Sequence, residues 1–97
     1  MAEEDVADVL SFTLRRWGET KYWEYSDLIE EAYLAITADP GIGRPRSTVR
    51  PSVLGHHIQQ PDRNARHVVF YRYDATKDRV TVLRVLHDSM DFDQHLQ

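Results

Sequence analysis

Hydrophobic and polar positions divide the chain into a helical first part and an extended second part. Between Glu3 and Arg16, apolar residues recur every three or four positions, which is the spacing of one face of an α-helix. The same spacing continues from Glu19 to Ala38, and Gly18 between the two segments is a typical helix terminator. Two helices joined at one glycine predict an antiparallel helical hairpin.

Each predicted helix has one apolar stripe. The stripe of the first helix contains Val6, Leu10, Leu14 and Trp17. The stripe of the second contains Tyr22, Tyr25, Ile29, Ala32, Tyr33 and Ile36. Trp23 and Leu34 lie outside the second stripe, which predicts a second contact surface on this helix. The second helix is expected to end at Asp39, because the residue before a proline disfavours helical geometry.

The remainder of the chain has the pattern of β-strands. Residues 66–73 and 79–87 are rich in Val, Phe, Tyr and Leu, and the polar turn between them predicts a β-hairpin. Shorter extended segments are expected at 47–53 and 56–60. Helices followed by strands predict an α+β domain. In it the N-terminal antiparallel helical hairpin packs on a C-terminal antiparallel β-sheet of about three strands, followed by a short C-terminal turn or helix.

Alternation along the last predicted strand assigns its side chains to two faces. One face is expected to carry Val80, Val82, Arg84 and Leu86, and the other Thr81, Leu83, Val85 and His87. Both faces are partly apolar. One is expected to carry the helices, and the other is expected to contact a partner.

Composition limits the class of protein. A chain of 97 residues is expected to form one domain, 1–97. It has no cysteine, it begins with acidic residues, and no apolar run approaches the ~20 residues that span a bilayer, so we expect a cytoplasmic protein with no membrane segment. Its net charge of −4 argues against a protein whose main task is to bind a phosphate backbone. The charge is uneven, because the N-terminal half is acidic and the C-terminal half is basic.

The end of the last strand carries the residues with chemical potential. RNA cleavage needs an acid, a base and cations over the phosphate, and the candidates are His87 as acid or base, Tyr71 as a weaker option, and Arg72 and Arg84 as clamps. The two arginines are expected to lie beside each other on paired strands. No second acid–base partner for His87 stands out. In the alternative interpretation Arg84 is bound by a carboxylate such as Asp91, and His87 caps the strand end.

No metal site and no cofactor are expected. His56 and His57 are adjacent, so on a strand they point to opposite faces and do not readily chelate one ion. His87 and His95 lack a third obvious ligand. We also expect no catalytic residues, since no paired carboxylates and no Ser-His-Asp arrangement stand out.

Several short motifs, in this order, resemble the ParE toxins of the RelE/ParE superfamily. They are Trp17-Gly18, the Asp39-Pro40 ending, Gly43-Arg44, Arg50, His67, Phe70-Tyr71-Arg72, Arg84-Val85-Leu86-His87 and Met90-Asp91, and they extend over nearly the whole chain. The resemblance implies the toxin half of a bacterial type II toxin–antitoxin pair. Such a protein inhibits DNA gyrase and is neutralised by a ParD-like antitoxin, in a heterotetramer or a larger complex. It implies no direct sequence-specific binding of nucleic acid by the toxin alone.

Two alternatives stay open at this stage. The relatives of RelE share the fold but are ribosome-dependent endoribonucleases that cut messenger RNA, and fold alone does not decide between the two activities. A degenerate domain that binds an antitoxin without being toxic is the other alternative. The chain also departs from the family pattern in two places: the leading strand before the first helix is missing, and the segment 52–65 is longer than its counterpart.

A binding protein needs a surface with arginine and apolar anchors rather than a catalytic set. The candidate contacts for antitoxin or target are Arg44, Arg46, Arg50, Arg72, Arg84, His87, Met90, Asp91, Trp23 and Leu34. The arginines are expected to form a basic strip for an acidic antitoxin tail. In the alternative interpretation Trp23 and Leu34 fill a corner of the small core. Tyr71 is expected in the core, and the segment from Arg84 to Asp91 is expected to form the hinge where the last strand turns into the tail.

Overall fold

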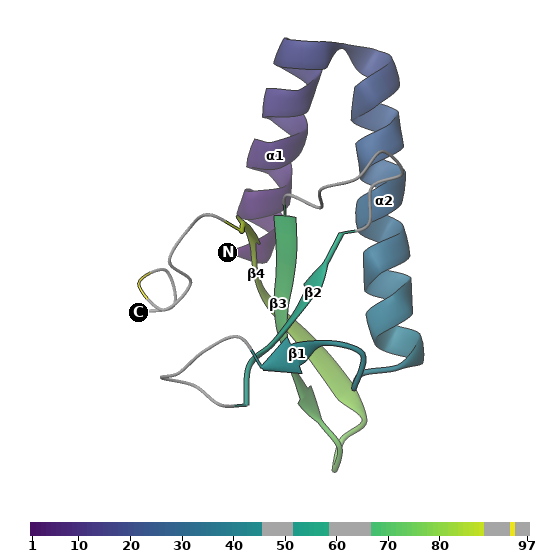
Figure 1. Ribbon diagram of the computed structural model, residues 1–97, viewed down its shortest axis with the longest axis vertical. Helices are drawn as coiled ribbons and strands as arrows, with labels where there is room; N and C mark the ends of the chain where they lie inside the picture. The colour runs from purple at the N-terminus through teal and green to yellow at the C-terminus, as the bar shows by residue number, and fades with distance from the viewer. Residues whose placement is uncertain (46–51, 59–66, 89–93, 95–97) are drawn as a thin grey trace.

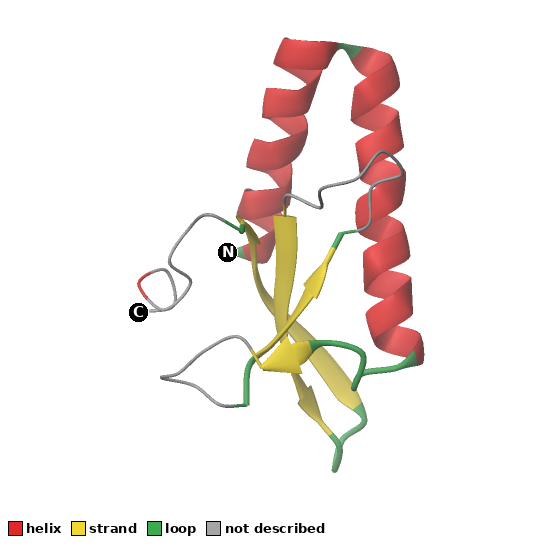
Figure 2. Ribbon diagram, in the orientation of Figure 1, coloured by secondary structure: helices red, strands yellow, loops and turns green. Residues whose placement is uncertain are grey.

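The computed structural model describes residues 1–45, 52–58, 67–88 and 94, and these form two layers. Two antiparallel helices lie on one face of a four-stranded antiparallel sheet (Figures 1 and 2). The elements are α1 (Ala2–Trp17), α2 (Glu19–Ala38), β1 (Arg44–Pro45), β2 (Leu54–His57), β3 (His67–Asp74) and β4 (Arg79–His87). The strands are neighbours in the order β1-β2-β3-β4. The α+β class and the helical hairpin are therefore confirmed.

The boundaries agree best where the local signals are strongest. The second helix spans Glu19–Ala38 and the last strand Arg79–His87, as predicted. The sheet has four strands instead of about three. The two short strands lie at Arg44–Pro45 and Leu54–His57, displaced from the predicted segments, of which residues 47–51 lie outside the described part of the chain.

The turn between the helices depends on Gly18. Its φ of 92° is a backbone conformation that residues with a Cβ rarely adopt, and it reverses the chain direction within one residue. The opposite end of α1 begins with an acidic first turn. This turn favours the start of the helix, because carboxylates are stabilised by the positive end of the helix dipole. Within the described residues α1 is the first element.

The main core lies between the helices and the sheet. Its buried members are Ile29, Ala32, Ile36, Ile58, Val69, Tyr71 and Val85, with Val6, Leu10, Tyr25, Leu28 and Tyr33 packed against them. The apolar stripe predicted for the second helix is thus the buried face of α2. The predicted core position of Tyr71 is confirmed, because its side chain is fully buried.

A β-bulge in β4 overturns the predicted alternation of this strand. Arg84 lies opposite Phe70 whereas Val82 lies opposite Tyr71, so Leu83 is an extra residue between two paired ones. A bulge of this kind reverses the facing of every residue beyond it. Val85 therefore joins the core under the helices, on the side of Val80 and Val82, whereas Leu86 joins a second cluster.

The second cluster fills the other face of the sheet. It contains Val53, Val68, Phe70 and Leu86, with Leu83 packed against it. Val53 and Val68 are fully buried, and the side chains of Phe70 and Leu86 are 4% and 5% exposed. These four apolar side chains need no partner to cover them, and a partner contact elsewhere on this face stays a prediction.

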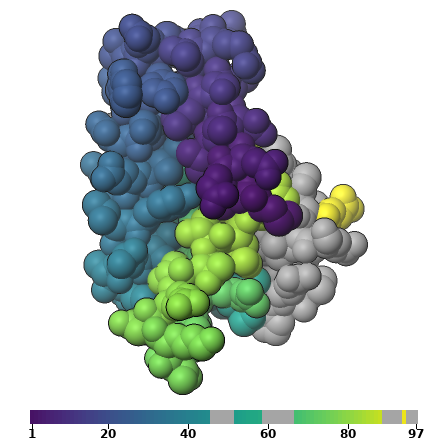
Figure 3. Space-filling model, turned by 180° about the vertical axis from the view of Figure 1, so that it is seen from behind, coloured from purple at the N-terminus to yellow at the C-terminus, as the bar shows by residue number. Residues whose placement is uncertain are grey.

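The helical hairpin extends beyond the sheet (Figures 1 and 3). Seen from behind, the first turns of α1 lie against β4, whereas the opposite end of both helices projects past the strands (Figure 3). Leu14 and Trp17 belong to the predicted stripe but are 42% and 62% exposed. The stripe of α1 is correct only up to Leu10, because the last turns of the helix have no sheet beneath them.

Candidate functional site

A shallow pocket opens where the first turns of α1 meet the ends of β3 and β4. Its volume is about 200 Å³. It is lined by Asp5, Asp8, Val9, His67, Arg84, Val85, Leu86 and His87. Two of the predicted site residues, Arg84 and His87, are thus brought together, and three titratable residues outside the predicted site join them: Asp5, Asp8 and His67.

Asp5 holds this corner of the fold together. Arg84 donates two hydrogen bonds to its carboxylate, from Nε at 2.7 Å and from a terminal nitrogen at 2.9 Å. The backbone N–H of Val85 donates a third, also at 2.9 Å. The two side chains are only 10% and 16% exposed, so the pair is largely removed from water. The hydrogen bond to Asp5 raises the pKa of Arg84, which keeps the guanidinium charged.

The same carboxylate closes an edge of the sheet. β4 is the last strand in the order of the described sheet, so backbone groups on its outer side do not pair with β3. Such unpaired edges are templates for unwanted strand pairing, and proteins commonly block them with charged side chains. Asp5 blocks the edge at Val85 by accepting its N–H.

The expected partner of Arg84 was a carboxylate near the end of the chain, such as Asp91. The structure shows that Asp5 supplies a carboxylate to Arg84. Asp91 lies outside the described residues, so its contact with Arg84 stays a prediction.

Two histidines at the ends of paired strands form the other wall of the pocket. His67 lies opposite His87 in the β3–β4 register, and their ring centroids are 5.4 Å apart in an edge-to-face arrangement. The Tyr25 hydroxyl and His67 Nδ1 share a hydrogen bond of 2.6 Å. His87 Nδ1 lies 3.5 Å from a carboxylate oxygen of Asp88. The absence of a second acid–base group beside His87, inferred from the sequence, is thus wrong.

Burial controls the charge of His67. Desolvation, and next the nearby His87, lower its pKa from 6.5 to about 4. Asp88 acts in the opposite direction but more weakly. His67 is therefore neutral at pH 7 and presents a hydrogen-bonding ring rather than a cation.

The residues proposed for RNA cleavage are not arranged for it. Arg84 directs its guanidinium to Asp5, and Tyr71 is buried with its hydroxyl donating to Pro40 O at 2.7 Å and accepting from Gly43 N at 2.9 Å. The charge of Asp5 is balanced by Arg84, and the exposed carboxylate of Asp8 in the lining repels a phosphate. Its geometry suits a structural junction or a contact with a protein better than phosphoryl chemistry.

Two predicted arginines lie on the opposite side of the sheet from the helices. Arg44 is opposite Gly55, which is opposite Phe70 of the second cluster, and Arg72 follows Phe70 by two residues. Directly opposed residues and residues two apart share a face. Arg44 and Arg72 are both exposed. Their strands, β1 and β3, lie on either side of β2, so two strand spacings of about 5 Å each separate them.

Of the five arginines predicted to form a strip, the structure describes Arg44, Arg72 and Arg84, so the strip stays a prediction. Arg84 is withdrawn to Asp5, and Arg72 lies opposite Thr81, so these two are not cross-strand neighbours. Arg46, Arg50 and Met90 lie outside the described residues.

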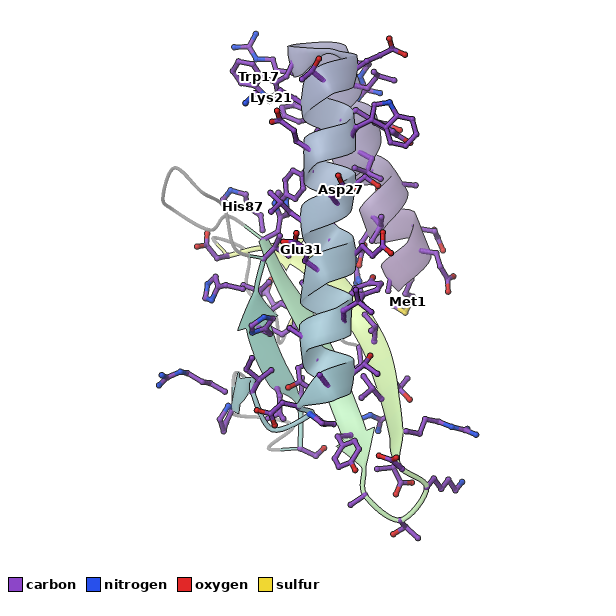
Figure 4. All side chains as sticks on the ribbon, turned by 90° about the vertical axis from the view of Figure 1, so that its right-hand side faces the viewer. Met1, Trp17, Lys21, Asp27, Glu31 and His87 are labelled. Carbon is purple, nitrogen blue, oxygen red and sulfur yellow. The ribbon has the colours of Figure 1, made fainter. Side chains whose placement is uncertain are left out.

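Trp23 and Leu34 are exposed on α2, with exposed fractions of 61% and 62%. The interpretation that they fill a corner of the core is wrong. They are eleven residues apart, about three helical turns, and therefore lie on one line along the helix. Asp27 and Glu31 point away from the sheet on the outward side of the same helix (Figure 4).

The described part of the chain has neither a metal-binding cluster nor a membrane-spanning helix. In the described ranges, no three His, Asp or Glu side chains are grouped so that they would hold a metal ion. Neither helix, over the residues that the structure describes, is long and apolar enough to cross a membrane.

Asp5 and His67 line the pocket but were not among the predicted site residues, although their places in the sequence gave weak indications. Asp5 precedes Val9 by four residues and Thr13 by eight, so it borders the apolar stripe of its helix, although it looks like part of a solvated acidic end. His67 and His87 each stand at the outer end of a predicted strand, and antiparallel pairing brings such ends together.

Comparisons with known proteins agree with this architecture. Residues 1–92 match the family described as "ParE toxin of type II toxin-antitoxin system, parDE". The chain is 30% identical to "Toxin ParE1" of Caulobacter vibrioides over 95 residues, which cover 98% of this chain and 90% of that toxin. It is 28% identical to "Toxin ParE1" of Mycobacterium tuberculosis over the same coverage. The chain therefore belongs to the ParE toxin family of type II toxin–antitoxin systems.

Proposed function

We propose that this protein is the toxin half of a type II toxin–antitoxin pair that inhibits DNA gyrase in the cytoplasm and is neutralised by a ParD-like antitoxin. The observation that carries the proposal is the family match, which extends over residues 1–92 and leaves little of the chain unaccounted for. The proteins named Toxin ParE1 are similar over almost the full length of the chain, which supports the same role.

The geometry of the pocket supports inhibition by binding rather than by catalysis. Arg84 is the arginine in the pocket lining, and its charge is neutralised by Asp5. Tyr71 uses its hydroxyl to fix the backbone after α2. A ribosome-dependent nuclease would need these groups available to RNA.

For the antitoxin we infer a contact on the helix-free face of the sheet. Arg44 and Arg72 are exposed there and share a face, so an acidic segment laid across β1, β2 and β3 reaches both. Charge-assisted hydrogen bonds from arginine to carboxylates are about twice as strong as neutral ones. In the described residues, this surface contains two of the five arginines predicted to form a strip.

Three assays test the proposed function. The gene is induced in bacteria, alone and with its antitoxin, and growth is followed. The purified protein is added to a gyrase supercoiling reaction and to a translating extract in which message integrity is measured. We expect growth arrest that the antitoxin relieves, loss of supercoiling and intact messages. Cut messages with normal supercoiling would favour the ribonuclease, and normal growth with both reactions unaffected would favour a non-toxic antitoxin-binding domain.

The antitoxin contact has its own test. Charge reversal in Arg44→Glu/Arg72→Glu is expected to weaken antitoxin binding by roughly 100-fold, since loss of a charged contact typically costs 2–5 kcal/mol when it is well buried by the partner and less at the rim. Arg15→Glu/Arg16→Glu is the matched control, because both arginines are exposed and lie in the last turn of α1, away from this face of the sheet. Equal weakening by both variants would show a diffuse charge effect and would reject the assigned surface.

A further inference from the structure

The end of the helical hairpin farthest from the sheet carries large exposed apolar side chains. We define the hairpin tip as residues 12–23, on both sides of Gly18. Its exposed members are Phe12 at 57%, Leu14 at 42%, Trp17 at 62% and Trp23 at 61%. Trp17 and Trp23 are the only two tryptophans of the chain. Large exposed apolar side chains on both helices of the tip are candidates for contact with a partner.

Packing within the described chain does not account for the hairpin tip. The last buried residue of α1 is Thr13, and the first buried residue of α2 is Ile29, so the turns between them contribute no buried side chain to the core. Figures 1 and 3 show this part of both helices standing beyond the strands. The apolar side chains here are therefore not explained by folding of the described residues.

The hairpin tip also holds every basic side chain of the two helices. These are Arg15, Arg16 and Lys21, whereas the helical turns outside the tip carry only acidic charges. The Arg16 guanidinium lies 5.1 Å from the centre of the Trp17 ring, a cation–π distance. Trp17 and Lys21 lie together at the end of the hairpin in Figure 4. Tryptophan and arginine are the residue types most enriched among the dominant contacts of protein interfaces.

The hairpin tip is separate from the surfaces assigned above. Trp17 follows Asp5 by twelve residues of helix, which corresponds to about 18 Å. Arg44 and Arg72 lie farther still, on the other face of the sheet. A partner at the tip and an antitoxin segment on Arg44 and Arg72 therefore need not compete for the same residues.

We propose that the hairpin tip is the surface with which this protein contacts its target, and that it inserts into an apolar groove bordered by carboxylates on a target protein. Exposed apolar side chains on both helices suit insertion into a groove, and the surrounding Arg15, Arg16 and Lys21 suit an acidic rim. Nucleic acid is the weaker partner, because Glu19 and Glu24 lie among these cations and Lys21 is already 3.2 Å from Glu24. The inference rests on the proposed function, in which the target is gyrase.

The two tryptophans make the proposal directly measurable. The protein is produced with 5-hydroxytryptophan, which is excited at wavelengths where the tryptophans of a partner do not absorb. Quenching of its fluorescence by acrylamide is then measured for the free protein, with gyrase and with the antitoxin. We expect gyrase to protect the label severalfold and the antitoxin to leave quenching unchanged. Protection by the antitoxin but not by gyrase would assign the tip to neutralisation and overturn the proposal.

Substitutions separate target contact from antitoxin contact. Trp17→Ser/Trp23→Ser is expected to abolish growth arrest and to raise the concentration that inhibits supercoiling by at least about 100-fold, the effect of losing roughly 3 kcal/mol at an interface centre. Binding of this variant to the antitoxin is expected to remain unchanged, which also shows that it folds. Ile42→Ser is the control, since Ile42 is an exposed apolar residue that follows α2, at the end of the hairpin opposite the tip. It is expected to retain full inhibition.

Each remaining outcome rejects one proposal and can be told apart from the other. If the double variant still arrests growth and inhibits gyrase, the tip proposal fails and the proposed function stands. If the unaltered protein leaves supercoiling normal, the gyrase assignment fails. The quenching measurement is then made with ribosomes, and a label that stays fully quenchable there as well rejects the tip as a target surface.

Discussion

The root of the helical hairpin, where α1 begins and α2 ends, is tied to the sheet by polar side chains, whereas the hairpin tip presents tryptophans to solvent. At the root, Asp5 connects α1 to β4 through three hydrogen bonds. Tyr71 of β3 connects to Pro40 and Gly43 just after α2. The two ends of one supersecondary unit thus differ in what their residues contact: the chain itself at the root, and solvent at the tip.

This difference separates stability from recognition. A buried polar group is costly unless it is paired, so residues at the root are constrained by the fold. Exposed residues outside the core usually change stability by less than about 0.5 kcal/mol when substituted, so residues at the tip are free to serve a partner. The predictions below test whether the two ends respond as differently as this comparison requires.

The largest effect is expected from Asp5→Ala. The substitution leaves the Arg84 guanidinium without its carboxylate and the Val85 N–H without its acceptor, and breaking a buried pair in this way costs roughly 3 kcal/mol. Urea denaturation measures the loss in unfolding free energy. Asp8→Ala is the control, because Asp8 lines the same pocket but is exposed, and it is expected to change little. Equal effects of the two variants would contradict the role given to the buried pair.

The next effect is expected from Tyr71→Phe. It removes the hydroxyl that holds the backbone of Pro40 and Gly43, and leaving buried groups unpaired costs about 2 kcal/mol. The approach is close, since a Cβ on Gly43 would lie 2.6 Å from the Tyr71 hydroxyl oxygen. Tyr73→Phe is the control, because Tyr73 is exposed and its hydroxyl bonds only to Asp78 at the surface. A loss no larger than that of the control would show that the hydroxyl contributes nothing to the root.

A smaller effect is expected from pH. The pKa of His67 is about 4 in the folded protein and near 6.5 when unfolded, so the unfolded chain takes up the proton first as pH falls. The stability that neutral His67 gives the folded protein is therefore complete above pH 6.5 and is lost as the pH falls from 6.5 to about 4. Because His67 is only partly buried, screening limits the loss to about 1 kcal/mol. Stability curves of His67→Gln and His57→Gln check this: the first is expected to flatten this slope and the second to keep it.

The smallest effect on folding is expected at the hairpin tip. Trp17→Ser/Trp23→Ser removes two large side chains but no buried contact, and the unfolding free energy is expected to change by less than about 1 kcal/mol. Thermal and urea unfolding measure it. A loss as large as that of Asp5→Ala would show that the tryptophans belong to the fold, and the contrast between root and tip would not hold.

Local signals predicted most of the architecture. The bounds of α2 follow from Gly18 before it and Pro40 after it, and those of β4 from a run of β-branched residues between polar turns. These signals act within a few residues and therefore remain readable in sequence.

What the sequence could not predict depends on contacts between distant residues. The bulge at Leu83 arises from how β3 and β4 pair, and one extra residue moves Val85 to the helix side of the sheet. The exposure of Trp17 depends on where the sheet ends, which nothing in the helical pattern records. The family resemblance identified the protein class, but of the predicted site residues that the structure describes only Arg84 and His87 line the pocket.

The contact between Asp5 and Arg84 also sets an order of events during synthesis. The two residues are 79 positions apart, so the root of the hairpin cannot close until β4 has left the ribosome. Until then α1 and α2 form only a nascent pair of helices without the strands that complete their core. A product that stops before β4 would lack both Arg84 and the strand edge that Asp5 blocks. Folding to the state described above is in this way coupled to synthesis of β4.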